Sequence, residues 1–374
     1  MNDIKLMNRA ADNIRILAAS MVEKAKSGHP GGAMGGADFV NVLFSEFLIY
    51  DPENPLWEGR DRFFLDPGHM SPMLYSVLAL AGKFSIEELM QFRQWGSVTP
   101  GHPEVNFERG VENTSGPLGQ GHTYAVGAAI AAKFLQARLG EEVMNQTIYA
   151  YISDGGIQEE ISQGAGRVAG TLGLNNLIMF YDANNVQLST TVEEVDNENV
   201  AMKYEAWGWK VLTIDGNDVA QIRQALVEAK AEEKRPTLII GNTIMGKGAK
   251  GADQSSYENK VSTHGQPLSA AGASMEETIK NLGGDPAQPF VIFPEVVQLY
   301  ANRKEELKAI MAEKKAIKEA WTKAHPELAV KMENWFAGKV PAIDWAAIEQ
   351  KANQATRAAS AKVLGVLAEQ VEKM

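Results

Sequence analysis

Apolar positions along the chain fall into two patterns, continuous runs and helical spacing, and from residue 147 the two patterns alternate. Continuous runs of this length indicate buried strands, and apolar residues three and four positions apart indicate helices. Strands that alternate with helices in this way predict βαβ units and a parallel sheet, whose ligands bind beyond the carboxyl ends of the strands. The strands are expected at 63–66, 147–154, 176–183, 209–215 and 237–244, with helices at 159–173 and 220–234.

The remaining segments are mainly helical in pattern. Helical spacing recurs at 14–27, 37–49 and 120–139, and from about 285 the chain becomes charged and helical until a hinge-like VPAID at 340–344. We therefore predict an α/β domain at 1–284, a helical extension and linker at 285–345, and the start of a further domain at 346–374.

Composition narrows the class of protein. The 374 residues are enough for one large α/β unit with an appendage, and the formal net charge of −11 argues against a basic, nucleic-acid-binding surface. The chain has no cysteine, so disulfides, thiolate nucleophiles and cysteine-bound zinc are excluded. No apolar run is long enough to span a membrane. We predict a soluble, cytoplasmic protein with neither a nucleic-acid nor a membrane partner.

Five of the six histidines stand next to a glycine. His29, His69, His102 and His122 each follow a glycine, and His264 precedes one. Glycine lets the backbone approach a ligand closely, and imidazole can donate or accept a proton near neutral pH. The pattern indicates several imidazoles held close to a ligand, although a lone histidine is most often a structural residue.

The segment SDGGIQEE, residues 153–160, lies where a predicted strand meets a helix. Asp154 stands at the carboxyl end of that strand, and Asn184 ends the next strand. Their oxygens are hard ligands that suit magnesium or calcium, and magnesium is commonly shared with phosphate oxygens. The amides of Gly155 and Gly156 could hold that phosphate. From the residues alone, it stays open whether Asp154 only caps the helix and Asn184 only fills a turn.

Blocks of sequence then point to one family. They are SGHPGG, DPGHMSPMLY, TPGHPE, TSGPLGQG, SDGG with YDANN, GNTIMGKG and THGQPL. In this order they resemble the N-terminal half of transketolase over nearly the whole chain, although Ser153 stands where the family usually has glycine. The resemblance implies a thiamine diphosphate-binding α/β fold, in which a central, mostly parallel sheet is flanked by helices and followed by a helical C-terminal connector.

The resemblance also implies cofactors, which are thiamine diphosphate and Mg²⁺, or Ca²⁺ or Mn²⁺ in its place. The metal would be bound by Asp154, Asn184 and the backbone carbonyl of Val186. Leu118 would lie between the two rings of thiamine diphosphate. The full set of cofactor contacts implied by the family is His69, Gly116, Leu118, Gly155, Asn184 and His264.

Catalytic and substrate-binding roles come from the same resemblance. His29, His69, His102 and His264 would be catalytic, and His29, His102 and His264 would also contact the sugar. Arg357 matches an arginine that contacts the sugar phosphate. Glu159 matches a glutamate at the interface between subunits, although the position of its family partner holds Gly164 here. His122 is interpreted as a packing residue.

The implied reaction transfers a two-carbon ketol unit from a ketose phosphate to an aldose phosphate, as in the pentose phosphate pathway. The family places the glutamate that activates the cofactor in a second, pyrimidine-binding domain. We therefore expect the chain alone to be inactive and to need a C-terminal transketolase half or subunit, whether it belongs to a split enzyme or is a truncated piece. We also expect a homo-oligomer. The alternatives are a non-catalytic diphosphate-binding partner, or part of another thiamine-dependent transferase such as deoxyxylulose-phosphate synthase.

Overall fold

The computed structural model describes residues 1–371 and divides into two compact units. The first unit contains residues 1–315, and the second begins at residue 316. The division falls within the long helix α13 (Pro294–Ala324). The sheet and all the residues that line the cavities described below belong to the first unit.

The first unit is built on a five-stranded sheet in which every pair of neighbours is parallel. The order of the strands is β1-β2-β3-β5-β4. Nearly every residue of β2, β3 and β5 is buried, which explains why these strands appear in the sequence as continuous apolar runs. The predicted α/β fold with a parallel sheet is confirmed. The strands are β1 (Arg62–Leu65), β2 (Ile148–Ser153), β3 (Leu177–Ala183), β4 (Lys210–Asp215) and β5 (Thr237–Asn242).

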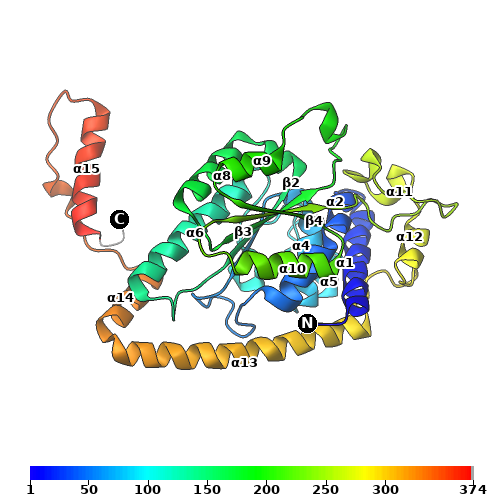
Figure 1. Cartoon of the computed structure of the whole chain (residues 1–374), viewed down its shortest axis with the longest axis horizontal. Coiled ribbons are helices and arrows are strands. Elements are labelled where there is room, and N and C mark those ends of the chain that lie inside the picture. The colour runs from blue at the N-terminus through cyan, green and yellow to red at the C-terminus, as the bar shows by residue number, and fades with distance from the viewer. Residues whose placement is uncertain (372–374) are drawn as a thin grey trace. The chain divides into compact units, whose positions relative to one another are not determined.

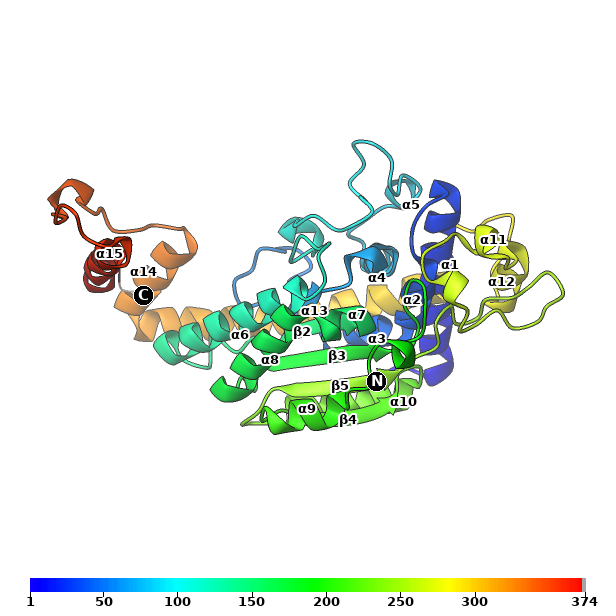
Figure 2. The same cartoon turned by 90° about the horizontal axis from the view of Figure 1, so that it is seen from above.

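Helices cover both faces of the sheet, and successive residues of a strand point into two separate cores. In β2, Tyr149 and Tyr151 lie in one core, whereas Ile148, Ala150 and Ile152 lie in the other. The first core includes residues of α1 (Ile4–Ala25), α3 (Ala37–Val42), α4 (Ser71–Leu80) and α10 (Val219–Lys230). The second includes residues of α6 (Gln120–Leu139), α8 (Glu160–Leu172) and α9 (Val200–Ala206) (Figure 1, Figure 2).

The helices predicted at 159–173 and 220–234 differ from α8 and α10 by one to four residues at their ends, and two other helices differ more. Helix α1 begins at Ile4 rather than at residue 14, because the Asp3 side chain caps it by accepting a hydrogen bond from the Leu6 amide (3.2 Å). The predicted helix 37–49 is divided into α3 and a π-helical turn, η1 (Leu43–Phe47). The predicted helix 120–139 coincides with α6. The other short helices of the first unit are α2 (Pro30–Gly35), α5 (Ile86–Leu89), α7 (Asp154–Gln158), α11 (Leu268–Ala271) and α12 (Met275–Asn281).

After the end of α13, the second unit contains two helices, α14 (Pro326–Phe336) and α15 (Thr356–Gln370). The segment between them is irregular except for a short 3-10 turn at Trp345–Ala347. The predicted domain boundaries at 284/285 and 345/346 stay predictions, and residues 372–374 of the third range lie outside the described residues. Within the described part of the chain, no helix is both long and apolar enough to cross a membrane.

Candidate active site

A cavity of about 450 Å³ opens at the carboxyl ends of β2 and β3, and we call it the strand-end cavity. This is the position at which a parallel sheet of this kind binds its ligands. Eight residues predicted for the site line the cavity, namely His69, Leu118, Asp154, Gly155, Glu159, Asn184, Val186 and His264. The structure thus brings together segments that are far apart in the sequence.

Asp154 and Asn184 lie side by side because of the register of the sheet. Ser153, the residue before Asp154, pairs with Asp182 on the parallel strand β3. The segments that follow β2 and β3 therefore leave the same edge of the sheet next to each other. Asp154 is buried, and the Tyr181 hydroxyl donates a hydrogen bond to its Oδ1 (2.6 Å). Its Oδ2 has no partner. Burial raises the pKa of the Asp154 carboxyl to about 7.

These properties fit a hard cation. A buried carboxylate oxygen without a partner is unfavourable, and a bound cation would both pair it and return its pKa towards the ordinary range. The described residues contain no cluster of three His, Cys, Asp or Glu side chains that could hold a metal. An ion here would therefore depend on Asp154, neutral oxygens and ligand phosphate, which is a set typical of magnesium. Asn184 Oδ1 already accepts the Val186 amide (3.0 Å), which fixes the turn that follows β3.

Three histidines form a cluster beside this point. The ring centroids of His29 and His69 are 5.0 Å apart, those of His69 and His264 are 5.4 Å apart, and those of His29 and His264 are 5.9 Å apart. His29 lies directly before α2, and His69 lies in the short 3-10 turn Gly68–Met70 that follows β1. His264 lies in the segment after β5, directly after the 3-10 turn Val261–Thr263. Nδ1 of His29 and Nδ1 of His264 are buried without a hydrogen-bond partner.

The histidines do not keep the ordinary imidazole pKa. Burial lowers the pKa of His29 to about 4, and its neighbour His264 adds to this effect. Burial also lowers the pKa of His69 well below the ordinary value, with a further contribution from His29. For His264, burial lowers the pKa, and a hydrogen bond to the backbone of Val186 opposes the shift. In this state the three are neutral imidazoles at pH 7, able to donate or accept hydrogen bonds but carrying no charge.

His102 lines a neighbouring cavity of about 910 Å³ rather than the strand-end cavity. A Cβ built on Gly68 would lie 3.0 Å from His102 Cδ2, so the imidazole packs against the backbone directly before His69. Arg93 lines the same cavity and donates a hydrogen bond to Ser27 Oγ (2.8 Å), while its Nε is buried without a partner. Arg93 was not predicted from the sequence. It has a φ of 61°, which is uncommon for a residue with a side chain.

Glycines in the predicted motifs allow close contacts that a side chain would prevent. A Cβ on Gly31 would lie 2.3 Å from Met245 Sδ and 2.6 Å from the Thr263 carbonyl oxygen. The amide of Gly156, which we expected to be free for phosphate, donates to Ser153 Oγ (3.4 Å). Ser153 therefore caps the turn at the position where the family usually has glycine, and Gly155 remains the predicted phosphate contact.

Some predicted residues lie outside the strand-end cavity. Gly116 is half-buried and does not line it, and Arg357 is exposed on α15 of the second unit. His122 is fully buried, and its Nδ1 is 2.6 Å from Ser162 Oγ, as expected for a packing residue. Conversely, Gln158 and Gln187 line the cavity, and each has a buried Nε2 without a partner. Gln158 lies within the SDGGIQEE segment, but its residue type gave it no role there, and Gln187 lies in no motif that the sequence analysis used.

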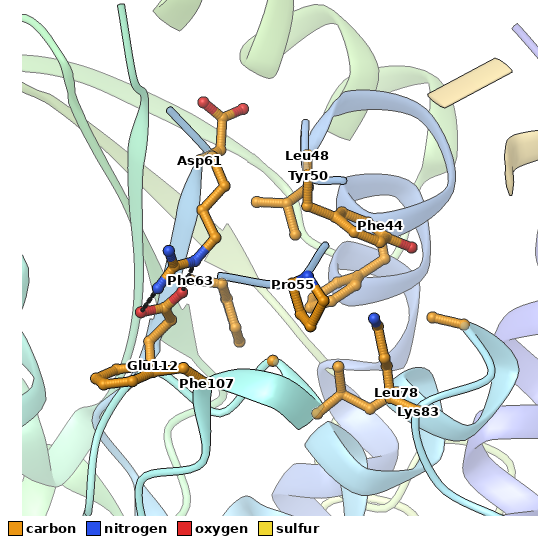
Figure 3. Close-up of a pocket in the computed structure, with 13 residues that line it drawn as sticks. Phe44, Leu48, Tyr50, Pro55, Asp61, Phe63, Leu78, Lys83, Phe107 and Glu112 are labelled. Atoms are coloured by element: carbon orange, nitrogen blue, oxygen red, sulfur yellow. Dashed lines mark hydrogen bonds and ion pairs between the residues drawn. The ribbon is translucent and has the colours of Figure 1, made fainter. Parts of the chain in front are cut away.

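A third cavity, of about 40 Å³, lies beside the amino end of β1, and we call it the β1 cavity (Figure 3). Apolar side chains such as Phe44, Leu78 and Phe107 form much of its wall. Its acidic groups are paired: Glu112 accepts hydrogen bonds from Arg60 Nε (2.8 Å), and Asp61 accepts them from backbone amides. None of the predicted site residues lines this cavity.

Comparison with known proteins identifies the family. Residues 6–341 match the family model described as "Transketolase, thiamine diphosphate binding domain". The chain belongs to the transketolase family. It is 40% identical over 385 aligned positions to the transketolase of Geobacillus stearothermophilus, covering 98% of this chain and 55% of that protein. It is 42% identical over 342 positions to transketolase 1 of Escherichia coli, covering 88% of this chain and 49% of that protein.

Solved transketolases have the same fold. The structure from Leishmania mexicana matches with a TM-score of 0.90 at 33% identity, covering 98% of this chain and 54% of that one. The structure from Campylobacter jejuni matches with a TM-score of 0.88 at 38% identity, covering 99% and 56%. The chain thus spans about half the length of the transketolases it matches and corresponds to their N-terminal half. These relatives do not favour the alternatives of a non-catalytic binding partner or a deoxyxylulose-phosphate synthase.

Proposed function

We propose that this chain binds thiamine diphosphate and takes part in the transketolase reaction, the transfer of a two-carbon ketol unit from a ketose phosphate to an aldose phosphate. The observation that carries the proposal is the strand-end cavity, which is lined by a buried, half-paired Asp154 and by His69 and His264, with His29 packed against these two histidines. Membership of the transketolase family supports the choice of cofactor. The metal, pathway and cytoplasmic location predicted from the sequence belong to this proposal.

Asp154, Asn184 and the Val186 carbonyl would hold Mg²⁺, which would bridge to the diphosphate. Thiamine diphosphate, when bound, supplies the carbon centre that carries the ketol unit. In the proposal, the Gly155 amide and the side chains of His69 and His264 contact the diphosphate or the reacting end of the cofactor. Leu118 supports the rings from its position against Gly155, since a Cβ on Gly155 would lie 2.9 Å from Leu118 Cδ1.

His29 and His102 would contact the hydroxyl groups of the sugar. A neutral imidazole can accept a proton at one ring nitrogen and donate at the other, so these residues can both orient the substrate and move its protons. Arg93 adds a permanent cation beside His102, with a buried Nε that has no partner in the protein. We assign to Arg93 the anionic end of a sugar phosphate, together with the predicted contact from Arg357.

A partner surface is also part of the proposal. Apolar residues are exposed along one side of α8 and on the adjacent α6, and exposed apolar patches commonly mark interfaces. We assign this surface to a part corresponding to the C-terminal half of the relatives, or to a second copy of the chain. Glu159, which precedes α8 at the edge of the cavity, would lie at this interface. The exposed residues are Tyr124 and Ile130 on α6, and Ile161, Val168 and Leu172 on α8.

The test is a coupled ketose-to-aldose assay at saturating thiamine diphosphate and Mg²⁺. We expect no measurable turnover from this chain alone, because it would lack the cofactor-activating glutamate that the family resemblance places in the second domain, and loss of an acid-base group lowers the rate by about 10²–10⁴-fold. We expect turnover when a polypeptide corresponding to the C-terminal half of the relatives is supplied. His102→Ala in the active enzyme should reduce turnover more than cofactor binding. Turnover near the rate of a complete transketolase without any second half would disprove the need for a partner, and absence of cofactor binding would disprove the function.

A further inference from the structure

Asp66 directly follows β1, and its side chain is fully buried. Its carboxylate accepts three backbone hydrogen bonds, from the amides of Gly119 (3.1 Å), Gly121 (2.8 Å) and His122 (3.3 Å). Its carbonyl oxygen accepts a fourth hydrogen bond, from Ser115 Oγ (2.6 Å). Asp66 therefore ties the end of β1 to a segment some fifty residues later in the chain.

The three amides belong to the N-terminus of α6, which has no cap of its own. The N-cap residue is Gly119, with a φ of 83° and no side chain, and the first turn contains no acidic residue. The first N–H groups of a helix lack partners within the helix and carry a partial positive charge. Asp66 supplies both the cap and the counter-charge for this 20-residue helix.

Asp66 also lies against the glycine turn at the end of β2. A Cβ built on Gly156 would lie 2.4 Å from Asp66 Oδ2, and a Cβ on Gly121 would lie 2.4 Å from Asp66 Cα. A side chain at either position would clash with Asp66, so both positions require glycine when Asp66 has this conformation. The turn that contains Gly156 also contains Asp154 and Gly155, which line the strand-end cavity.

These contacts join two walls of the cavity. On one wall, Leu118 immediately precedes Gly119, whose amide donates a hydrogen bond to Asp66. On the other wall, Gly155 immediately precedes Gly156, which packs against the Asp66 carboxylate. Asp66 lies outside the lining of the cavity itself. It does not contact a molecule bound there directly, and it positions such a molecule through the residues that its hydrogen bonds hold.

We propose that Asp66 is a positioning residue of the cofactor site, which holds the Leu118 loop at a fixed distance from the turn at Gly155. The inference rests on the proposed function, because it assigns those two walls to thiamine diphosphate. Without the carboxylate, three buried amides lose their partner and the loop is free to move. An apolar wall that has moved away from the cofactor rings binds them less well.

The test compares Asp66→Asn and Asp66→Ser with wild type in the active enzyme assembled with its second half. Calorimetric titration with thiamine diphosphate and Mg²⁺ should show affinity weaker by about 10–100-fold, the usual effect of losing a residue that orients a site. The KM for the ketose should stay within about twofold of wild type, because the hydrogen bonds of the Asp66 carboxylate go to Gly119, Gly121 and His122 and not to the proposed sugar contacts His29, His102 and Arg93.

Asp61→Asn is the matched control, because it separates positioning from general stability. Asp61 is also a buried carboxylate beside β1, and it accepts backbone amides from Ile49 (3.0 Å) and Thr147 (2.8 Å), but it lies at the other end of the strand in the β1 cavity (Figure 3). Its substitution should lower the melting temperature without weakening cofactor binding.

The outcomes separate this inference from the proposed function. Cofactor affinity that is unchanged in both Asp66 variants, or weakened equally by Asp61→Asn, would overturn the positioning role and leave the function intact. Failure of the wild-type enzyme to bind thiamine diphosphate would overturn the proposed function, and this inference with it. Asp66→Ser, which keeps a small acceptor, provides a second folded variant if Asp66→Asn fails to fold.

Discussion

In the β1 cavity, Glu112 accepts hydrogen bonds from Arg60 and Arg62, and Asp61 accepts two backbone amides. In the strand-end cavity, by contrast, Asp154 Oδ2 and His264 Nδ1 are buried without partners. Both cavities contain a carboxyl whose pKa is raised by burial, to about 6 for Asp61 and about 7 for Asp154. A raised pKa therefore does not distinguish a ligand site from a structural group, whereas the pairing of the polar atoms does.

The difference has a physical basis. A protein that folds without its ligand must leave unpaired the groups that the ligand will pair, and it bears the cost of their burial until binding occurs. Groups with a purely structural role have no reason to stay unpaired. The strand-end cavity should consequently respond to substitution through ligand binding, and the β1 cavity through stability.

The largest effect is expected in the β1 cavity. Glu112→Ala removes the acceptor shared by two arginines, of which Arg60 is itself buried, and leaves their charges without compensation. Breaking a buried ion pair from one side costs about 3–5 kcal/mol of unfolding free energy. Urea denaturation should show this loss, while calorimetry should show unchanged affinity for thiamine diphosphate. A substantial loss of cofactor affinity at normal stability would mean that the two cavities are not functionally distinct.

Asp154→Ala should show the opposite pattern. Removing the only carboxylate proposed to bind the metal should weaken Mg²⁺-dependent binding of thiamine diphosphate by about 2–4 kcal/mol, since the diphosphate then lacks a properly held counter-ion. Calorimetric titration at fixed Mg²⁺ measures the change, with Glu112→Ala as the comparison from the other cavity. Cofactor affinity equal to that of wild type would remove Asp154 from the metal site.

The sequence was sufficient for the framework of the site. The central strands were found because both faces of this parallel sheet are covered, which makes β2, β3 and β5 nearly continuous apolar runs. Once β2 and β3 are taken as neighbouring parallel strands, Asp154 and Asn184 must meet at the same edge. The positions of the histidines came instead from the family resemblance, since no local pattern places His29 beside His264.

What could not be predicted depends on contacts between distant segments. Arg93 lines a cavity because of an irregular loop in which it takes a left-handed conformation, and helical or strand periodicity carries no information about such loops. Asp66 appeared only as the last residue of a short apolar run, because its partners lie on α6. Neutral histidines were likewise not foreseen, since their pKa depends on burial that the sequence does not show.

The smallest expected effect concerns the cost of leaving Asp154 half-paired. Because burial raises its pKa from 3.8 to about 7, the folded protein binds this proton more tightly than the unfolded chain does. Stability of the cofactor-free protein should therefore fall as the pH rises from about 4 to about 7, and stay reduced above that range.

Asp154→Asn removes that pH-dependent contribution. The variant keeps an oxygen that accepts the Tyr181 hydroxyl hydrogen bond, but it still buries a polar amide, and this burial offsets much of the stability gained by removing the charge. We therefore expect its melting temperature to be only about 2 °C above that of wild type at pH 8, and no higher than that of wild type at pH 4. With thiamine diphosphate and Mg²⁺ the order should reverse, because only the wild type then gains the binding energy. Asp61→Asn, in the other cavity, should differ from wild type by the same amount with and without the cofactor. Melting curves across this pH range test the comparison directly: if the Asp154 variant is less stable than wild type at pH 8 without cofactor, its carboxylate is not a group held in an unfavourable state for a ligand.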